Sequence, residues 1–407
     1  MNMKKLMILA LMMLGTSVAF AAQSDALKAI LKAKTFDDAE ALVKSSLNSL
    51  VGNEEKAAAY NKLVDLAMEK VSKEQEAMQN NQMVEQLKTG KLAPVDTIGY
   101  EKACYDAVLN GLECEKYDIL PNVKGKVKPK FHDANANRLW PIRTQLIMYG
   151  QEIGEKDKDL ALKVFSTYVD SNKSSLFSGI DRSKQPDEYL GEVSRVAAVY
   201  AYQTKNIDLA NKYVDIALED TATYKQALDM KIFFASQGLK TKDDSLKFEK
   251  TLEELYVKNP GSDVVFGQLA SLYQSLGQPE RGAKMIEDRL AKDPNNYTAL
   301  ALKAQTDMNA QRYDEAIAGF KKALSIKDDD PLVYAYMGFC INAKAAASQS
   351  VQDQKKLYTE SLPYLEKCRQ IDPERQHANW AYPLLQCYYS LYGENDARTK
   401  ELEALIK

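Results

Sequence analysis

Apolar residues recur along most of this chain at intervals of three and four, the spacing that amphipathic helices show. The pattern is clearest in residues 295–328, where two such stretches flank a short polar turn at 309–312. In the second stretch, the small residues Ala316 and Ala323 lie on either side of Phe320. This spacing lets two antiparallel helices pack closely, so the segment predicts a helical hairpin.

The spacing of the second helix recurs at other places, which start at Phe36, Lys158 and Ile207. One period of about 34 residues upstream, at Asp263, a stretch matches the tetratricopeptide consensus of a large aromatic, Leu, Gly, Tyr and a closing Pro. The matching residues are Phe266, Leu269, Ala270, Tyr273, Gly277 and Pro294. One period downstream, the first three of these positions hold Tyr334, Met337 and Gly338.

These residues resemble the tetratricopeptide repeat (TPR) family over about 187–407, with a weaker match upstream. The resemblance implies an all-α fold, a TPR-like α-solenoid in which antiparallel helical hairpins form a right-handed superhelix. We expect hairpins at 191–219, 224–258, 263–291, 297–326, 331–371 and 379–406. The hairpin that begins at Pro331 exceeds the family period, and we place its extra residues, 345–355, in the turn between its helices.

Upstream of residue 187 the chain predicts less regular elements. Apolar periodicity indicates one extended helix over 53–82. Further on, Pro141 follows Trp140, so a helix either starts there or kinks. The polar loop 171–188 contains Leu176 and Phe177, which suggest that it packs against the protein. The block at 98–131 as a whole looks like a region found in exported bacterial TPR proteins of unassigned role.

The N-terminal 21 residues have the features of a Sec-type signal peptide. Lys4 and Lys5 precede a short apolar run, and Ala19-Phe20-Ala21 forms a small-x-small cleavage site. A buried N-terminal helix is the alternative. We therefore expect cleavage after Ala21, a periplasmic location and no transmembrane segment in the mature chain. The predicted domains are the signal peptide at 1–21, an N-terminal helical region with a capping half-repeat and a Lys-rich loop at 22–130, and TPR-like repeats at 131–407.

Charge and motifs disfavour nucleic-acid binding and catalysis. The formal net charge is −3, whereas nucleic-acid-binding proteins usually carry a basic excess. The two histidines, His132 and His377, lie far apart and lack metal-ligand spacing, and the motifs of common hydrolases and nucleotide-binding proteins are absent. Most carboxylates occupy helix starts or solvated positions. We predict no enzyme activity, no cofactor and no metal site.

The five cysteines are Cys104, Cys114, Cys340, Cys368 and Cys387. An exported protein permits disulfides, and a bridge between Cys368 and Cys387 is geometrically possible in the repeat register. Buried free thiols that act as small apolar residues are the favoured interpretation.

Family resemblance and helical spacing together place a candidate binding site. On the first helix of a TPR hairpin, positions 2, 5, 9, 12 and 13 line the concave groove. These positions hold Arg195, Tyr202, Gln203, Ser271, Gln274, Gln305, Met308, Asn309, Phe339 and Asn342. The lining is mainly neutral and lacks the Lys/Asn clamp that holds a peptide's terminal carboxylate in some TPR proteins. We therefore expect an internal segment or a folded surface as the ligand.

A second candidate contact is the Lys-rich loop at 121–131. Its lysines alternate with other residues, so an extended chain would place all four ammonium groups on one side, where they could meet an acidic partner or a phosphate. They are Lys124, Lys126, Lys128 and Lys130. The plainer interpretation is a solvated loop.

Taken together, the sequence predicts an exported TPR scaffold that mediates protein–protein interaction in the bacterial envelope without catalysis. The expected partner is a protein or peptide, with no nucleic acid. Two alternatives remain: a periplasmic chaperone or assembly factor, and a glycan-binding or glycan-cleaving helical toroid. The toroid would need two carboxylates facing each other across a sugar.

Overall fold

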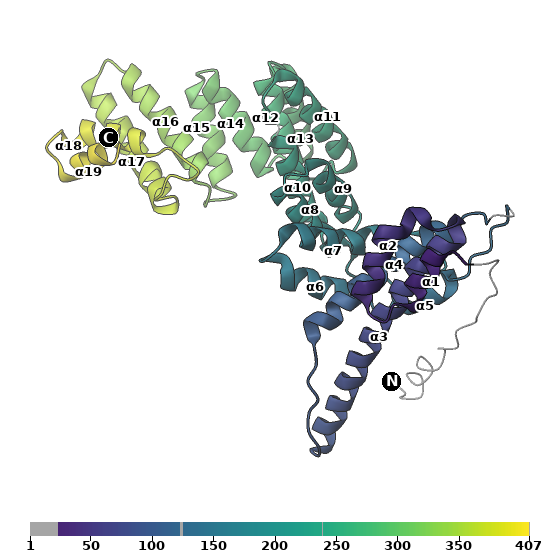
Figure 1. Ribbon diagram of the computed structural model, residues 1–407. Coiled ribbons are helices and arrows are strands. Elements are labelled where there is room, and N and C mark those ends of the chain that lie inside the picture. The colour runs from purple at the N-terminus through teal and green to yellow at the C-terminus, as the bar shows by residue number, and fades with distance from the viewer. Residues whose placement is uncertain (1–22, 123–124, 238, 407) are drawn as a thin grey trace. The chain divides into compact units, whose positions relative to one another are not determined.

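The computed structural model describes residues 23–122, 125–237 and 239–406. Within these residues the chain is entirely helical, with nineteen α-helices, two short 3₁₀ turns and no strand (Figure 1). The predicted all-α class is therefore confirmed. The chain divides between Phe234 and Ala235 into two compact units, called here the N-terminal and C-terminal units. The predicted signal peptide and Lys124 lie outside the described residues, and the domain boundary expected at residue 130 stays a prediction.

In its described residues, the N-terminal unit contains nine complete helices, joined by connections of very different length. They are α1 Asp25–Lys32, α2 Phe36–Ser46, α3 Gly52–Leu87, α4 Thr97–Asp118, α5 His132–Leu139, α6 Gln145–Gly154, α7 Lys158–Ser171, α8 Leu190–Gln203 and α9 Ile207–Ala217. The extended helix expected over 53–82 is confirmed by α3. Helix α10, Tyr224–Ser236, crosses the division between the units.

The C-terminal unit continues as antiparallel hairpins. Its helices are α11 Lys242–Lys258, α12 Asp263–Ser275, α13 Pro279–Lys292, α14 Tyr297–Asn309, α15 Tyr313–Leu324, α16 Pro331–Ala347, α17 Val351–Ile371, α18 Ala381–Tyr392 and α19 Ala397–Ile406. Each predicted hairpin from 191 to 406 corresponds to one helix pair, which confirms the repeat register.

Local sequence explains where these helices begin. A side-chain oxygen precedes many first turns and accepts a backbone N–H, as Asn296 does from Ala299. Thr241 and Asp244 form a reciprocal capping box at the start of α11. Pro279 and Pro331 are the first residues of their helices, where the missing N–H costs nothing.

One expectation about these elements is wrong. The residues inserted at 345–355 do not enlarge the turn, because α16 runs to Ala347 and α17 begins at Val351. The insertion instead lengthens both helices. Alanines at 345–347 favour helix, and the Ser350 hydroxyl caps α17 by accepting the N–H of Asp353.

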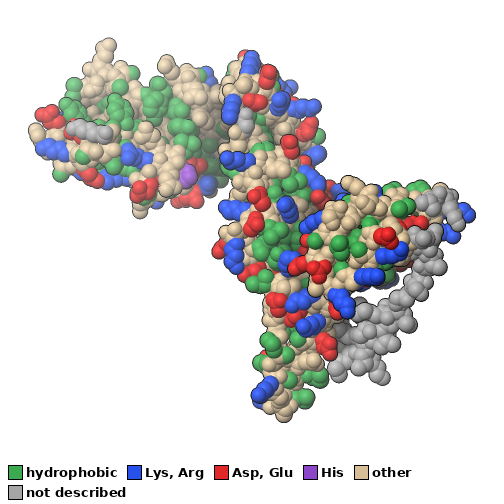
Figure 2. Space-filling model, in the orientation of Figure 1, with side chains coloured by type: hydrophobic (Ala, Val, Ile, Leu, Met, Phe, Trp, Pro, Cys, Tyr) green, Lys and Arg blue, Asp and Glu red, His purple; other side chains and the backbone are tan. Residues whose placement is uncertain are grey.

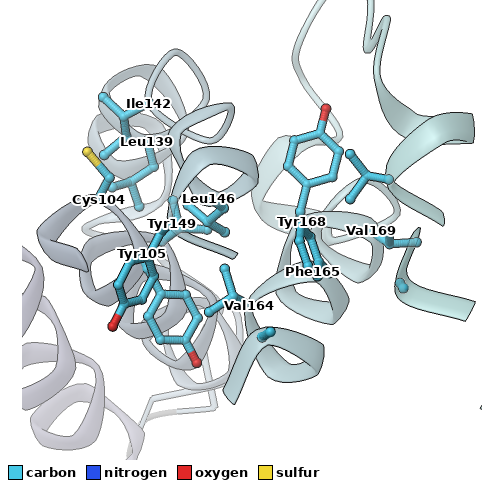
Figure 3. Close-up of a cluster of buried hydrophobic side chains, with 14 of the residues drawn as sticks. Cys104, Tyr105, Leu139, Ile142, Leu146, Tyr149, Val164, Phe165, Tyr168 and Val169 are labelled. Carbon is cyan, nitrogen blue, oxygen red and sulfur yellow. The ribbon is translucent and has the colours of Figure 1, made fainter. Parts of the chain in front are cut away.

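The core of the N-terminal unit forms where α4, α6 and α7 meet (Figure 3). Tyr105 from α4 and Tyr149 from α6 place their ring centroids 5.9 Å apart. Gly150 permits the close approach of α6 and α7, since a Cβ there would lie 2.6 Å from the Phe165 ring. Such a contact forces a shift, so glycine fits this position.

The loop between α7 and α8 packs as predicted. Leu176 and Phe177 are fully buried, and the Phe177 ring meets the Trp140 ring edge-on at 5.3 Å. Trp140 itself follows α5, and α6 begins only at Gln145. Pro141 therefore separates two helices rather than kinking one.

All five cysteines are free and buried, as the sequence favoured. The Cys368 thiol donates to the Pro331 carbonyl, and the Cys387 thiol donates to the Asn342 side chain. Burial raises the pKa of the Cys368 thiol to about 12 and that of Cys387 to about 11. Both thiols therefore stay protonated at neutral pH and are poor nucleophiles.

Candidate functional site on the first helices of the repeats

The first helices of successive hairpins in the C-terminal unit are joined by side-chain amides from the predicted site. The Gln274 amide on α12 donates to the Thr306 hydroxyl on α14 at 2.9 Å. One repeat on, Gln305 donates to the Tyr336 hydroxyl on α16 at 3.3 Å. These bonds fix neighbouring first helices in register while leaving both amides only partly buried.

A hollow of about 320 Å³ lies between α12 and α14. Three predicted residues, Ser271, Gln274 and Gln305, contribute to its lining. Its apolar lining residues are Ala270, Ile286 and Leu302, and its remaining polar lining residues are Ser275 and Thr306. The lining thus combines three aliphatic side chains with five side chains that can hydrogen-bond.

Phe339 on α16 is an exposed aromatic side chain. Its side chain is 46% exposed, and its ring meets the edge of Tyr313 at 6.4 Å. Met308 is partly buried against the neighbouring apolar cluster, and Asn309 is exposed at the end of α14. Phe339 and Asn309 are therefore accessible to solvent, and Met308 is partly so.

Asn342 requires a correction, because it does not face solvent. It is 3% exposed, and its amide nitrogen donates to the Pro383 carbonyl and the Gln386 side chain at 2.8 and 3.2 Å. Its oxygen accepts from the Cys387 thiol. With these bonds Asn342 holds α16 against α18 and has no group left for a partner.

Two tyrosines on α18 join the site but were absent from the prediction. Tyr382 and Tyr389 are 58% and 53% exposed, and their seven-residue separation places them on one helix face. Counted from Ala381, the first residue of α18, they occupy positions 2 and 9. The same register placed Phe339 at position 9 of α16, so counting from the true helix start would have found both tyrosines. We call one set of exposed and partly buried residues on α12, α14, α16 and α18 the first-helix face; they are Ser271, Gln274, Gln305, Met308, Asn309, Phe339, Tyr382 and Tyr389.

The predicted residues Arg195, Tyr202 and Gln203 lie on α8 in the N-terminal unit and form a separate set. The Arg195 guanidinium pairs with Glu192 at 2.5 Å, and Gln203 is exposed. Tyr202 stacks on Phe234 at 4.9 Å and meets Phe233 edge-on at 5.5 Å. Its ring therefore serves mainly to pack α8 against α10.

The three described lysines of the Lys-rich loop, Lys126, Lys128 and Lys130, do not all project into solvent as one row. The backbone turns at its start, where Gly125 donates to the Asn122 carbonyl with φ +71°. Lys130 lies back against the protein, with its backbone N–H on the Asp118 carboxylate and its ammonium 3.4 Å from Glu54. Lys126 and Lys128 are exposed and remain candidates for contact with a partner.

A family model described as tetratricopeptide repeat matches residues 275–338, which run from the end of α12 through α15 into α16. The chain therefore contains tetratricopeptide repeats. The matched segment includes three residues of the first-helix face, Gln305, Met308 and Asn309. Stacked helical repeats of this kind serve as extended binding surfaces.

The TPR protein is 22% identical over 219 residues to "Small glutamine-rich tetratricopeptide repeat-containing protein 2" of Saccharomyces cerevisiae. The match covers 53% of this chain and 59% of the yeast protein, so the chain spans about three fifths of that relative. Among solved structures, a human IFIT1 dimer with PPP-AAAA is similar at 16% identity and a TM-score of 0.40, covering 82% of this chain and 72% of that one. A tetratricopeptide repeat protein from Parabacteroides merdae is similar at 13% identity and a TM-score of 0.28, covering 66% and 99%.

In the part of the chain that the structure describes, no group of three or more His, Cys, Asp or Glu side chains could hold a metal ion. His132 begins α5 and bonds to Glu115, and His377 is exposed. The hollow between α12 and α14 is lined by amides, hydroxyls and aliphatic groups, which can hydrogen-bond and pack against a ligand.

Proposed function

We propose that this TPR protein is an exported, non-catalytic scaffold of the bacterial envelope that binds a protein or peptide partner on its first-helix face. The observation that carries the proposal is the combination of exposed aromatics, Phe339, Tyr382 and Tyr389, with the 320 Å³ hollow between α12 and α14. Large aromatic side chains supply contact area at low entropic cost and are common anchors at interfaces.

The character of the face suggests the kind of partner. Its polar groups are amides and hydroxyls, and none of its side chains carries a charge. A neutral lining favours apolar anchors and backbone amides over a charged terminus. An extended internal segment with one or two apolar side chains fits such a surface, with one anchor in the hollow beside Ser271 and another against the ring of Phe339.

Site-directed photocrosslinking in the envelope fraction provides the first test. A photoreactive residue at Ser271 should capture the partner, whereas the same residue at Val257, which is 80% exposed on α11, should not. Once the partner is identified, Phe339→Ala and Tyr389→Ala should each weaken its binding by about 2 kcal/mol, roughly thirtyfold. Both side chains are about half exposed, so the melting temperature of each variant should stay close to that of wild type.

Tyr189→Ala is the matched control, because Tyr189 is also about half exposed but lies on the N-terminal unit. It should leave the affinity unchanged. If Tyr189→Ala weakens binding while Phe339→Ala does not, the first-helix face is the wrong surface. If only Lys126→Gln with Lys128→Gln abolishes binding, the Lys-rich loop is the contact.

Export is part of the proposal and rests on the N-terminal sequence. A charged start, an apolar run and Ala19-Phe20-Ala21 support cleavage after Ala21. Among the described residues, no helix is both long and apolar enough to cross a membrane. N-terminal sequencing of the protein from the periplasmic fraction should read Ala22 first. Recovery of the chain with Met1–Ala21 intact would refute this part of the proposal.

A further inference from the structure

Helix α3 continues well beyond the part of the protein that supports it. Its last buried side chain is Glu74, but the helix ends only at Leu87, and an extended segment then returns to α4. We call residues 75–95 the finger. Figure 1 shows it projecting from the rest of the N-terminal unit, and none of its side chains is buried.

The finger has a defined shape despite its lack of a core. The Asn81 side chain clamps the returning segment, donating to the Ala93 carbonyl at 2.8 Å and accepting the Ala93 N–H at 2.7 Å. At the tip, Lys88 and Gly90 adopt left-handed backbone conformations that reverse the chain. A Cβ at Gly90 would lie 3.2 Å from Val84, so the returning segment passes close to the helix.

Three large aliphatic side chains are exposed at the end of the finger. Met83, Leu87 and Leu92 are 55%, 66% and 56% exposed. Met83 and Leu87 are four residues apart, so they share one side of α3. Figure 2 shows apolar side chains gathered over this end of the molecule. A helical extension without tertiary contacts is only marginally stable in water. Exposed apolar side chains at its tip therefore indicate a site of interaction.

Positive charge accompanies the apolar tip. Lys88 follows Leu87, and Lys91 precedes Leu92. The finger as a whole contains these two lysines and two acids, Glu76 and Glu85, and both lysines lie at its tip. In the described structure neither ammonium lies in an ion pair. Aliphatic side chains beside lysines form the pattern of segments that lie at a membrane interface, where lysine stems cover apolar surface and the ammonium groups reach lipid phosphates.

We propose that the finger inserts its tip into the interfacial region of an anionic phospholipid bilayer. Met83, Leu87 and Leu92 would enter the acyl boundary, with Lys88 and Lys91 at the phosphate level. A protein partner is less well supported, because residues 75–95 contain neither an aromatic residue nor an arginine, the usual anchors of protein interfaces. The tip is also a convex projection rather than a groove. This inference does not depend on the scaffold function.

Vesicle co-sedimentation of the full chain tests the proposal. Wild type should bind vesicles that contain phosphatidylglycerol more tightly than vesicles of phosphatidylcholine alone, and salt should weaken the difference. Leu87→Gln with Leu92→Gln should lower the partition coefficient at least about tenfold on both. Lys88→Gln with Lys91→Gln should lower it about thirtyfold on the anionic vesicles and leave neutral vesicles nearly unaffected.

The matched controls make the same kinds of substitution at exposed residues outside the finger. Val257→Gln removes an aliphatic side chain that is 80% exposed on α11, and Lys126→Gln with Lys128→Gln removes two exposed charges from the Lys-rich loop. Both should bind vesicles like wild type. The finger variants should keep the helicity and melting temperature of wild type, because no substituted side chain is buried.

A tryptophan at the tip gives a second readout. The two native tryptophans, Trp140 and Trp380, are 7% and 1% exposed, so their emission should not respond to lipid. Leu92→Trp should therefore show a blue shift only when vesicles are added. Three results would overturn the proposal: no wild-type binding to either vesicle, loss of binding through Lys126 and Lys128 instead, or self-association in solution that the leucine variant abolishes.

Discussion

Replacing Arg143 with Met should lower the free energy of unfolding of the N-terminal unit by about 3–5 kcal/mol. Arg143 is 2% exposed, and its guanidinium pairs with the Asp187 carboxylate at 2.5 Å. The same guanidinium donates to the Ser171 hydroxyl at 2.6 Å and to the Tyr168 carbonyl at 2.9 Å. Methionine would fill much of the volume but leave Asp187 without its cation, and an uncompensated buried charge is costly.

The hydrogen-bond partners of Asp187 explain why the loss of Arg143 should also destabilise the loop between α7 and α8. The carboxylate also accepts from the Tyr168 hydroxyl and from the Asn172 amide, the latter at 2.7 Å. Burial, followed by the contact with Asp187, raises the pKa of Tyr168, so its hydroxyl remains a donor. One carboxylate therefore joins α7 to the loop that leads into α8. Without Arg143, we expect this loop to detach first.

Thermal denaturation and hydrogen exchange measure both parts of this prediction. The melting temperature should fall by about 10 °C, and amides in residues 171–189 should lose protection before those of α4. Lys212→Met is the matched control, because Lys212 pairs with Asp170 at 2.7 Å while both side chains are about half exposed. Such a pair contributes about 0–1 kcal/mol. Equal effects of the two substitutions would contradict a structural role for the buried pair.

Local sequence signals account for most of the fold. The three- and four-residue spacing of apolar positions predicted each hairpin between 191 and 406, because a helix must bury one face whatever its neighbours are. The same reasoning misplaced the insertion at 345–355. Its alanines and polar residues look like a loop by composition, but alanine favours helix and Ser350 supplies a cap, so both helices grew instead.

Helical spacing predicted which helix face carries the candidate site, but not which of its polar side chains are buried. Helical spacing placed Ser271, Gln274 and Gln305 on one face, and all three line the hollow between α12 and α14. Spacing says nothing about which polar side chain a neighbouring helix will use. Asn342 has the same register as a lining residue, yet a carbonyl and an amide from α18 bury it.

Contacts between distant residues lay beyond prediction. Arg143 and Asp187 are separated by 44 residues and an irregular loop, and no periodic pattern links them. The surroundings of the finger could not be predicted from the sequence either. Periodicity predicted a long α3, but whether Met83 and Leu87 would meet another helix or solvent depends on where α4 begins. The sequence predicted where helices form, but it did not predict which distant segments would contact one another.

Trp380→Ala should destabilise the C-terminal unit by about 3–5 kcal/mol, the range for removing a large buried aromatic side chain. Trp380 is 1% exposed and packs in the apolar cluster formed by α16, α17, α18 and α19. Its indole N–H also donates to the Asp372 carbonyl at 2.6 Å. The substitution would therefore open a cavity and leave that carbonyl with the Arg375 N–H, at 3.1 Å, as its remaining donor.

The carboxylate of Asp372 organises the turn that carries Trp380. It accepts the N–H groups of Gln376, His377 and Ala378 at 2.8–2.9 Å. Burial acts to raise the pKa of Asp372, but these three donors together outweigh it and lower the pKa. The turn between α17 and α18 is thus fixed at one end by a carboxylate and at the other by an indole.

Two further variants separate the cavity from the lost hydrogen bond. Trp380→Phe keeps most of the ring but removes the N–H, and the Asp372 carbonyl keeps its bond from the Arg375 N–H, so about 0.5–1.5 kcal/mol should be lost. Tyr382→Ala, two residues later but 58% exposed, should change stability by no more than about 0.5 kcal/mol. If Trp380→Ala and Tyr382→Ala have the same melting temperature, the indole does not anchor α18.

The position of Trp380 makes the prediction informative about binding as well. The residue directly precedes α18, which carries Tyr382 and Tyr389 of the first-helix face. Below the global melting temperature, hydrogen exchange in Trp380→Ala should show α18 and α19 opening while α12 and α14 stay protected. A partner held by the whole face should then bind more weakly to Trp380→Ala, and its remaining contacts should centre on the hollow beside Ser271 and Gln305. Unchanged affinity in a variant whose α18 exchanges freely would show that the two tyrosines contribute nothing to the interface.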